Sequence, residues 1–269
     1  LSAKRLSIVA TIGKAAFEVL SDVKATITFL GEVVVRIVLA LLSPATFRFR
    51  ELFVQLQIAF VGALPVICLV TLLIGFVIAY LFAVQIEKYG GSIFIVDGVA
   101  LAMGRELSPL IVATVVAGRS GSSFTAQIGS MKLNEELDAI KILGLSVKEV
   151  LVLPRVIALM IAMPFLVFVG DVVGIAGGML ISNFQLDIRP VTFYERLRYA
   201  IPLHHFYSGL IKAPFFALFI GIIGSRLGLN VERNARSVGL STTATVVQSI
   251  VAVILLDAVF AIIYMELEY

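Results

Sequence analysis

Arg105 and Glu106 stand side by side inside a long apolar run, where ionisable groups are costly and usually functional. Neighbouring residues on a helix point about 100° apart, so the two side chains are not expected to be each other's main partner. Each therefore needs a residue on another helix, a water-filled cavity or a polar group of a ligand. Lys212 and Asp257 are the candidate partners for an internal salt bridge. A guanidinium also suits forked contacts with phosphate, so a lipid headgroup beside Arg105 is the other interpretation.

Two sets of small residues predict close helix packing, either within the chain or across a dimer. The first set lies in the run AGRSGSS and includes Gly118 and Gly121. The second set has glycines four residues apart, on one helix face: Gly170, Gly174 and Gly178. GRSGSS is not a phosphate-binding loop, because it lacks the Lys-Ser/Thr ending and a preceding strand.

A short, heavily charged segment, NEELDAIKILG, covers residues 134–144. Asn134 is a suitable N-cap, and Gly144 suits the end of a helix. A helix of about nine residues would be roughly 14 Å long and could not span a membrane. It is either a solvated loop helix or a docking helix for a cytoplasmic motor. In the second case the coupling residues are Asn134, Glu135, Glu136, Leu137, Asp138 and Ile140.

The sequence shows no catalytic or metal-binding constellation. His204 and His205 are adjacent and make a poor metal pair, and no Cys/His cluster, catalytic triad or acid pair is visible elsewhere. A membrane-embedded lipid-modifying enzyme is therefore unsupported, and no cofactor or metal is expected. Asp171, Lys212 and Asp257 are lone ionisable residues in apolar runs, which is what a proton relay would use. They keep an ion-coupled carrier open as an alternative.

The elements that position these residues are predicted to be membrane-spanning helices. The chain of 269 residues is 60% hydrophobic and 14% charged, with a mean hydropathy of +1.06. Soluble domains have roughly 25% charged residues. The alternating pattern of a membrane barrel is missing, so we expect an all-α membrane protein. Five spans are predicted, near residues 56–84, 93–129, 149–182, 202–224 and 241–265.

Residues 1–50 are predicted to form an interfacial elbow segment, and residues 51–269 the five-helix transmembrane domain. Charged residues recur too often near the N-terminus for a span, while apolar residues fall at helical spacing. Residues 27–42 are the alternative, as a tilted span that ends at Ser43-Pro44. The chain starts at Leu1 rather than Met, which leaves room for a further segment before it in the native protein.

Basic residues are distributed unequally between the predicted loops. Those on one side are Arg48, Arg50, Arg119, Lys132, Lys141, Lys148, Arg155, Arg226, Arg233 and Arg236; the other side has Lys88, Arg189, Arg196 and Arg198. The positive-inside rule places the N-terminus in the cytoplasm and the C-terminus outside. The segment at 134–144 is then cytoplasmic.

The stretch GRELSPLIVATVVAGRSGSSFTAQIGSMKLNEELDAIKILG resembles the signature of the MlaE/YrbE permease family. Members of that family are membrane subunits of ABC systems that move phospholipids between bacterial membranes. SGLIKAPFFALFIGIIG and VGLSTTATVVQSIVAVILLDAVF resemble the family's fourth and fifth spans, so the similarity extends from about residue 55 onward. Ser108 stands where Gly is common, which is a small departure.

The resemblance implies a homodimer in the bacterial inner membrane, with ATP and Mg²⁺ bound by a separate ATPase and no cofactor in this chain. A cytoplasmic ATPase dimer would grip the helix at 134–144. An MCE-domain hexamer would sit outside in the periplasm, with a STAS-domain protein on the ATPase. Lipid would occupy an outward-facing cavity at the dimer interface, near Arg105, Glu106 and Leu107, with Tyr89 at its mouth.

Overall fold

The computed structural model describes residues 8–42, 49–87, 91–200 and 204–266, and the chain divides into two compact units, Leu1–Phe47 and Arg48–Tyr269. In the first unit, helix α1 (Ile8–Leu42) is continuous for 35 residues. It is not among the helices that are long and apolar enough to cross a membrane. Its place in the interface stays a prediction, and the predicted break at Ser43-Pro44 lies outside the described residues.

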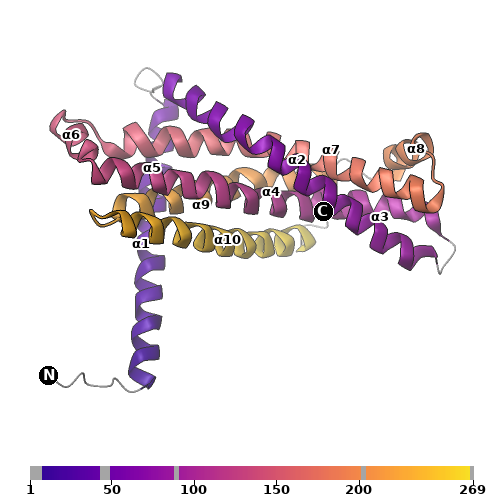
Figure 1. Cartoon of the computed structure of the whole chain (residues 1–269), viewed down its shortest axis with the longest axis horizontal. Coiled ribbons are helices and arrows are strands. Elements are labelled where there is room, and N and C mark those ends of the chain that lie inside the picture. Colours follow the sequence, from indigo (N-terminus) through magenta and orange to yellow (C-terminus); the bar gives the residue numbers. More distant parts are fainter. Residues whose placement is uncertain (1–7, 43–48, 88–90, 201–203, 267–269) are drawn as a thin grey trace. The chain divides into compact units, whose positions relative to one another are not determined.

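The second unit contains five apolar helical segments of membrane-spanning length: Phe49–Ile86, Ser92–Leu133, Lys148–Leu186, His205–Asn230 and Ala235–Glu266. These agree with the five predicted spans and confirm the all-α membrane fold for the described part of the chain. Their main helices are α2 (Phe49–Glu87), α7 (Leu153–Leu186), α9 (His204–Asn230) and α10 (Ala235–Glu266), with α3, α4 and α5 in the second span (Figure 1).

The second span is assembled from short helical pieces rather than one regular helix. After a 3₁₀ turn, Ser92–Phe94, come α3 (Ile95–Leu101), α4 (Ser108–Val116) and α5 (Ser122–Leu133), separated by π-helical turns at Ala102–Leu107 and Ala117–Gly121. Pro109 has no N–H to donate to the preceding turn, and a wider turn accommodates the missing bond. Arg105 and Glu106 therefore lie on a π turn, a feature often found at functional sites.

Helices α2 and α7 pack closely along their lengths, because glycines let the two backbones touch. A Cβ atom added at Gly75 would collide with the carbonyl oxygen of Gly174, and one added at Gly177 would collide with that of Leu72. Beside this crossing, Ile67 and Leu166 are completely buried in the apolar core that α2, α4, α7 and α9 share. The crossing sets the position of α7 for the sites described below.

Gly177→Val is expected to destabilise the protein by about 3 kcal/mol or more, because the new side chain meets backbone that cannot rotate away. The expected observation is loss of the monodisperse peak in size-exclusion chromatography after extraction. Gly239→Val is the matched control, since a Cβ atom added there would have no neighbour within 4 Å. If both variants remained equally monodisperse after heating, close α2–α7 packing would not limit stability.

Two short helices lie at opposite ends of this unit (Figure 1). Helix α6 (Glu136–Ile142) follows α5, and α8 (Pro190–Ala200) connects α7 to α9. The sequence left residues 183–202 without an assigned structure, so α8 is new. Phe193 is buried, and Arg196 donates from Nε to Asp97 Oδ1 on α3 at 2.9 Å. These contacts fasten α8 to the end of the second span.

Candidate functional site

Four ionisable side chains from three spans meet inside the second unit. The Lys212 ammonium on α9 lies 2.6 Å from Glu106 Oε2 and 2.7 Å from Asp257 Oδ1 on α10. Arg105 Nε lies 3.3 Å from Glu106 Oε1. The Lys212 side chain is 0% exposed, so the ammonium depends on these two carboxylates in place of water. We call Arg105, Glu106, Lys212 and Asp257 the charge cluster.

The internal salt bridge predicted from the sequence is present, and both proposed partners take part in it. The expectation that Arg105 and Glu106 would point apart was only half right. Glu106 is closest to Lys212, as expected, but it also accepts a hydrogen bond from Arg105. The π turn explains the difference, because its wider circumference reduces the angle between successive side chains.

A close backbone contact brings Lys212 to the cluster. A Cβ atom added at Gly209 would collide with the carbonyl oxygen of Gly104, so α9 lies directly against the π turn. Lys212 is three residues after Gly209 and projects from nearly the same face of α9. Tyr264 of α10 donates its hydroxyl to the Ser208 carbonyl at 3.1 Å, which fixes α10 beside α9. The three spans thus hold the charges in contact.

Leu107 and Tyr89 are the other two residues that were predicted to lie near lipid. Leu107 is partly buried and packs against an apolar cluster that includes Ile95 and Met103. Tyr89 lies outside the described residues. Contact of Arg105, Glu106 and Leu107 with lipid stays a prediction.

The small-residue positions divide into packed and open ones. An added Cβ at Gly121 would lie 3.1 Å from Ile220, one at Gly170 would lie 2.6 Å from Ser108 Oγ, and one at Gly178 would lie 2.6 Å from Val99. At Gly174 it would collide with Met103. A Cβ atom added at Gly118, by contrast, would meet no other described part of the chain within 4 Å. Four of the five positions thus receive neighbouring side chains within the chain, and Gly118 faces outward.

Helix α6 is shorter than predicted, and its cap differs. Glu135, rather than Asn134, occupies the position before the helix, with a left-handed backbone at φ 62° and no side-chain cap. Asn134 instead donates to Glu136 Oε1 at 3.2 Å, because the preceding α5 still includes Leu133 and leaves Asn134 in the turn. Gly144 ends the segment with φ 73°, in agreement with its predicted role. Leu137 is buried and anchors the helix.

Two of the predicted coupling carboxylates already have a partner inside the chain. Arg233, between α9 and α10, lies 2.7 Å from Asp138 Oδ2 and 3.4 Å from Glu135 Oε1. The hydrogen bond and charge of Lys141, together with Arg233, hold the pKa of Asp138 below its usual range. Asp138 is therefore ionised at neutral pH, and this contact links α6 to the distant α9–α10 connection.

Sequence reasoning missed the exposed surface of this segment. Ile142 and Leu143 are 87% and 73% exposed, whereas Ile140 is only partly exposed. Two adjacent apolar residues within a charged loop were the available signal, but the predicted coupling residues ended at Ile140. The outward side of the segment is thus apolar as well as acidic.

Comparisons with known proteins decide the family. The family model described as "Permease MlaE" matches residues 52–263, which include the charge cluster and α6. The chain belongs to the MlaE permease family. A probable ABC transporter permease protein of Rickettsia bellii is 36% identical over 202 residues, covering 74% of this chain and 78% of the relative. One of Synechocystis is 38% identical over 183 residues, covering 66% and 69%.

A plant relative is also similar to this MlaE-family chain. The chloroplastic protein TRIGALACTOSYLDIACYLGLYCEROL 1 of Arabidopsis thaliana is 32% identical over 236 residues, covering 88% of this chain and 66% of that protein. Together with the five membrane-spanning helices, these matches show a membrane transport permease of the ABC type. A permease of this type implies a separate ATPase partner.

Proposed function

We propose that this MlaE-family chain is the non-catalytic permease subunit of an ABC transporter that moves phospholipids between the inner and outer bacterial membranes. Family membership carries the proposal, and the galactolipid in the name of the plant relative supports a lipid as cargo. ATP and Mg²⁺ would bind the ATPase subunits, and the permease would contribute only conformational change. The cytoplasmic N-terminus inferred from the basic residues puts α6 on the ATPase side.

Coupling would run from α6 to the charge cluster through the spans. Helix α6 follows α5, the last segment of the span that carries Arg105 and Glu106. Thr125 of α5 lies 2.6 Å from Thr245 of α10 and donates to the Gly224 carbonyl of α9 at 2.8 Å. Movement of α6 would therefore reach the same three spans that meet in the charge cluster. The ATPase would shift the permease between two states by binding one of them more tightly.

The assembly would be a homodimer, with a cytoplasmic ATPase dimer, a periplasmic MCE-domain hexamer and a STAS-domain protein on the ATPase. A groove between α5 and α10 supports contact with a second copy. Most of its lining side chains are small or carry a hydroxyl group, and such residues favour close approach of helices in membranes. The outward-facing Gly118 precedes the first lining residue, Ser122, by one helical turn. The lining residues are Ser122, Ser123, Ala126, Thr242, Thr243, Val246 and Val247.

The charge cluster also favours a second candidate, an ion-coupled secondary carrier for a lipid or other amphiphile. Such a carrier would use the same four ionisable residues as a proton path. The two candidates require different energy sources. The deciding experiment is transfer of a labelled phospholipid from proteoliposomes that contain the permease, with or without its ATPase.

Transfer is expected only when both the ATPase and ATP–Mg²⁺ are present, and a proton gradient alone is expected to have no effect. A Walker-motif variant of the ATPase, which binds the permease but does not hydrolyse ATP, is the control. Transfer driven by a proton gradient in proteoliposomes lacking the ATPase would establish the carrier instead.

A further inference from the structure

A second feature, distinct from the α5–α10 groove, is a lateral cavity between α7, α8 and α9. Its volume is about 460 Å³, within the range of about 300 to 1,000 Å³ typical of small-molecule sites. Val172, Tyr194 and Tyr207 at its edge are exposed, so a ligand can enter from the side.

The wall of this cavity is almost entirely apolar, and aromatic rings form a large part of it. Five of its lining residues are aromatic: Phe168, Phe193, Tyr194, Phe206 and Tyr207. Of the described lining residues, only Asp171 carries a charge. Aromatic faces are electron-rich and attract cations, and attraction increases when water is excluded. The wall therefore favours a positively charged, apolar ligand over an anion.

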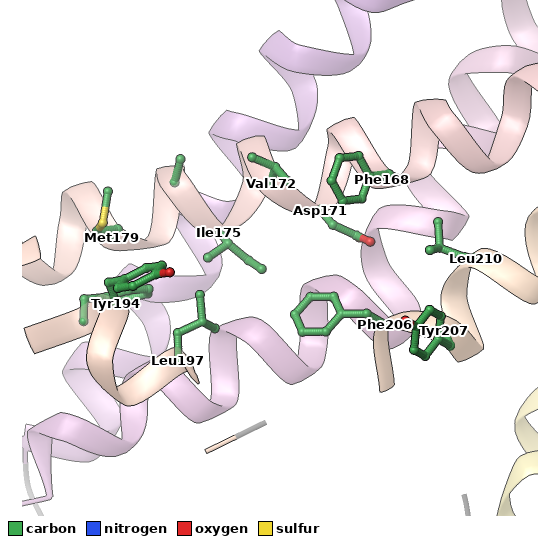
Figure 2. A pocket seen from close by; sticks show the side chains of 12 residues that line it. Phe168, Asp171, Val172, Ile175, Met179, Tyr194, Leu197, Phe206, Tyr207 and Leu210 are labelled. Carbon is green, nitrogen blue, oxygen red and sulfur yellow. The ribbon is translucent and has the colours of Figure 1, made fainter. Parts of the chain in front are cut away.

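The Asp171 carboxyl lies in the cavity without a full set of partners. The residue is only 3% exposed, and Oδ1 has no hydrogen-bond donor among the described residues. Figure 2 shows the carboxyl extending from α7 towards the side where α9 contributes Phe206 and Tyr207. Leaving a buried carboxyl oxygen without a hydrogen bond is costly, so a hydrogen-bond donor of a bound ligand would be stabilised beside Oδ1.

The local charges do not balance. The Lys212 ammonium forms its ion pairs with Glu106 and Asp257. The charge cluster and Asp171 together contain three carboxyl groups and two basic groups, Arg105 and Lys212. Asp171 is the carboxyl group that has no ion pair within this group, and it lines the cavity.

We propose that this cavity binds an amphiphile with one ammonium group and one hydrocarbon chain, which enters from the membrane. The ammonium would donate to Asp171 Oδ1 and lie against the rings of Phe206 and Tyr207. The chain would lie along α7 beside Ile175 and Met179. This site is separate from lipid transport and does not depend on the ATPase-driven mechanism.

The test uses the absence of tryptophan from the sequence. Phe168→Trp places a single fluorescent reporter in the cavity wall, and Phe76→Trp places one on the exposed face of α2, outside the cavity. Each full-length protein is reconstituted in phosphatidylcholine nanodiscs and titrated with ω-bromoundecylammonium, whose bromine quenches nearby tryptophan. The anion ω-bromoundecyl sulfate is the matched probe of opposite charge.

Saturable quenching is expected for Phe168→Trp with the ammonium probe only, and weak non-saturable quenching for Phe76→Trp. Adding Asp171→Asn should weaken binding about tenfold or more, because a charge-assisted hydrogen bond is lost. If Asp171→Asn prevents folding, Tyr207→Leu serves in its place and should weaken binding several-fold through loss of the ring. Equal quenching by both probes, or at both reporters, would overturn the proposal, as would unchanged binding in a folded Asp171→Asn variant.

Discussion

Lys212→Met is expected to abolish transport and to destabilise the helical bundle by roughly 3 kcal/mol or more, the cost of removing one partner from a buried ion pair. The buried ammonium contacts Glu106 and Asp257 from two other spans, and Met would leave both carboxylates without it. Arg105 can still neutralise Glu106, because it already donates to Oε1. Asp257 would then be the uncompensated charge.

The double variant Lys212→Met/Asp257→Asn separates structural from functional roles of the charges. It removes one cation and one carboxylate, and it leaves the Arg105–Glu106 pair intact. Replacing both members of a buried pair is often close to neutral, so most of the lost stability should return. Stability is measured as the fraction of purified protein that remains monodisperse after heating, and transport as ATP-driven release of labelled phospholipid from proteoliposomes.

The ATPase-driven mechanism predicts that the double variant also recovers at least half of the transport rate, because Lys212 and Asp257 only hold spans together. A proton path through the charge cluster predicts a stable but inactive double variant. If the double variant were as unstable as Lys212→Met alone, packing of the long Lys212 side chain, and not charge, would be the main contribution.

The sequence predicted those parts of the fold that depend on composition over long windows. The five spans follow from apolar length, and Lys212 and Asp257 were correct candidates because isolated charges in membrane helices must find partners. The Arg105–Glu106 contact was not predicted, because regular α geometry was assumed where the chain forms a π turn. Helical periodicity cannot show a change of period that lasts for one turn.

Contacts between residues far apart in the sequence could not be predicted from the sequence either. Arg233 is about a hundred residues from Glu135, and no local pattern joins them. Helix α8 was missed for a related reason, because its charged residues resemble those of a solvated loop. Its contacts are with residues far away in the sequence: Arg196 binds Asp97, and Phe193 belongs to an apolar cluster with residues of α3 and α7. Asp171 appeared only as a lone acid, since the aromatic residues around it come from three separate helices.

Ile142→Asp/Leu143→Asp is expected to weaken binding of the ATPase by about a hundredfold or more, while the permease still folds. Both side chains are exposed in the isolated chain, so the substitution costs little in folding. Burying each in an interface contributes about 1.5 to 3 kcal/mol, and a charge in their place would oppose docking. Co-purification of the ATPase with tagged permease, followed by its lipid-stimulated ATP hydrolysis, measures the effect.

The matched control is Val191→Asp/Tyr199→Asp, which makes the same change at two exposed positions of α8, at the opposite end of the unit (Figure 1). This control should retain normal ATPase binding. Charge reversal at Glu136 should also weaken binding, and it leaves the Arg233 contacts intact. Reversal at Glu135 or Asp138 is less informative, because it breaks those internal contacts as well.

The swap Asp138→Arg/Arg233→Asp distinguishes the two roles of the acidic residues. If Asp138 serves mainly to hold α6 against the α9–α10 connection, the swap should preserve the internal ion pair and most of the ATPase activity, whereas Asp138→Arg alone should lose both. Glu135→Gln and Lys141→Gln are included in both proteins, because the swap would otherwise place a like charge beside each of these side chains. If the swap is still as defective as the single reversal, Asp138 contacts the ATPase directly. Normal ATPase binding by the Ile142/Leu143 variant would show that the motor does not dock on the apolar end of α6.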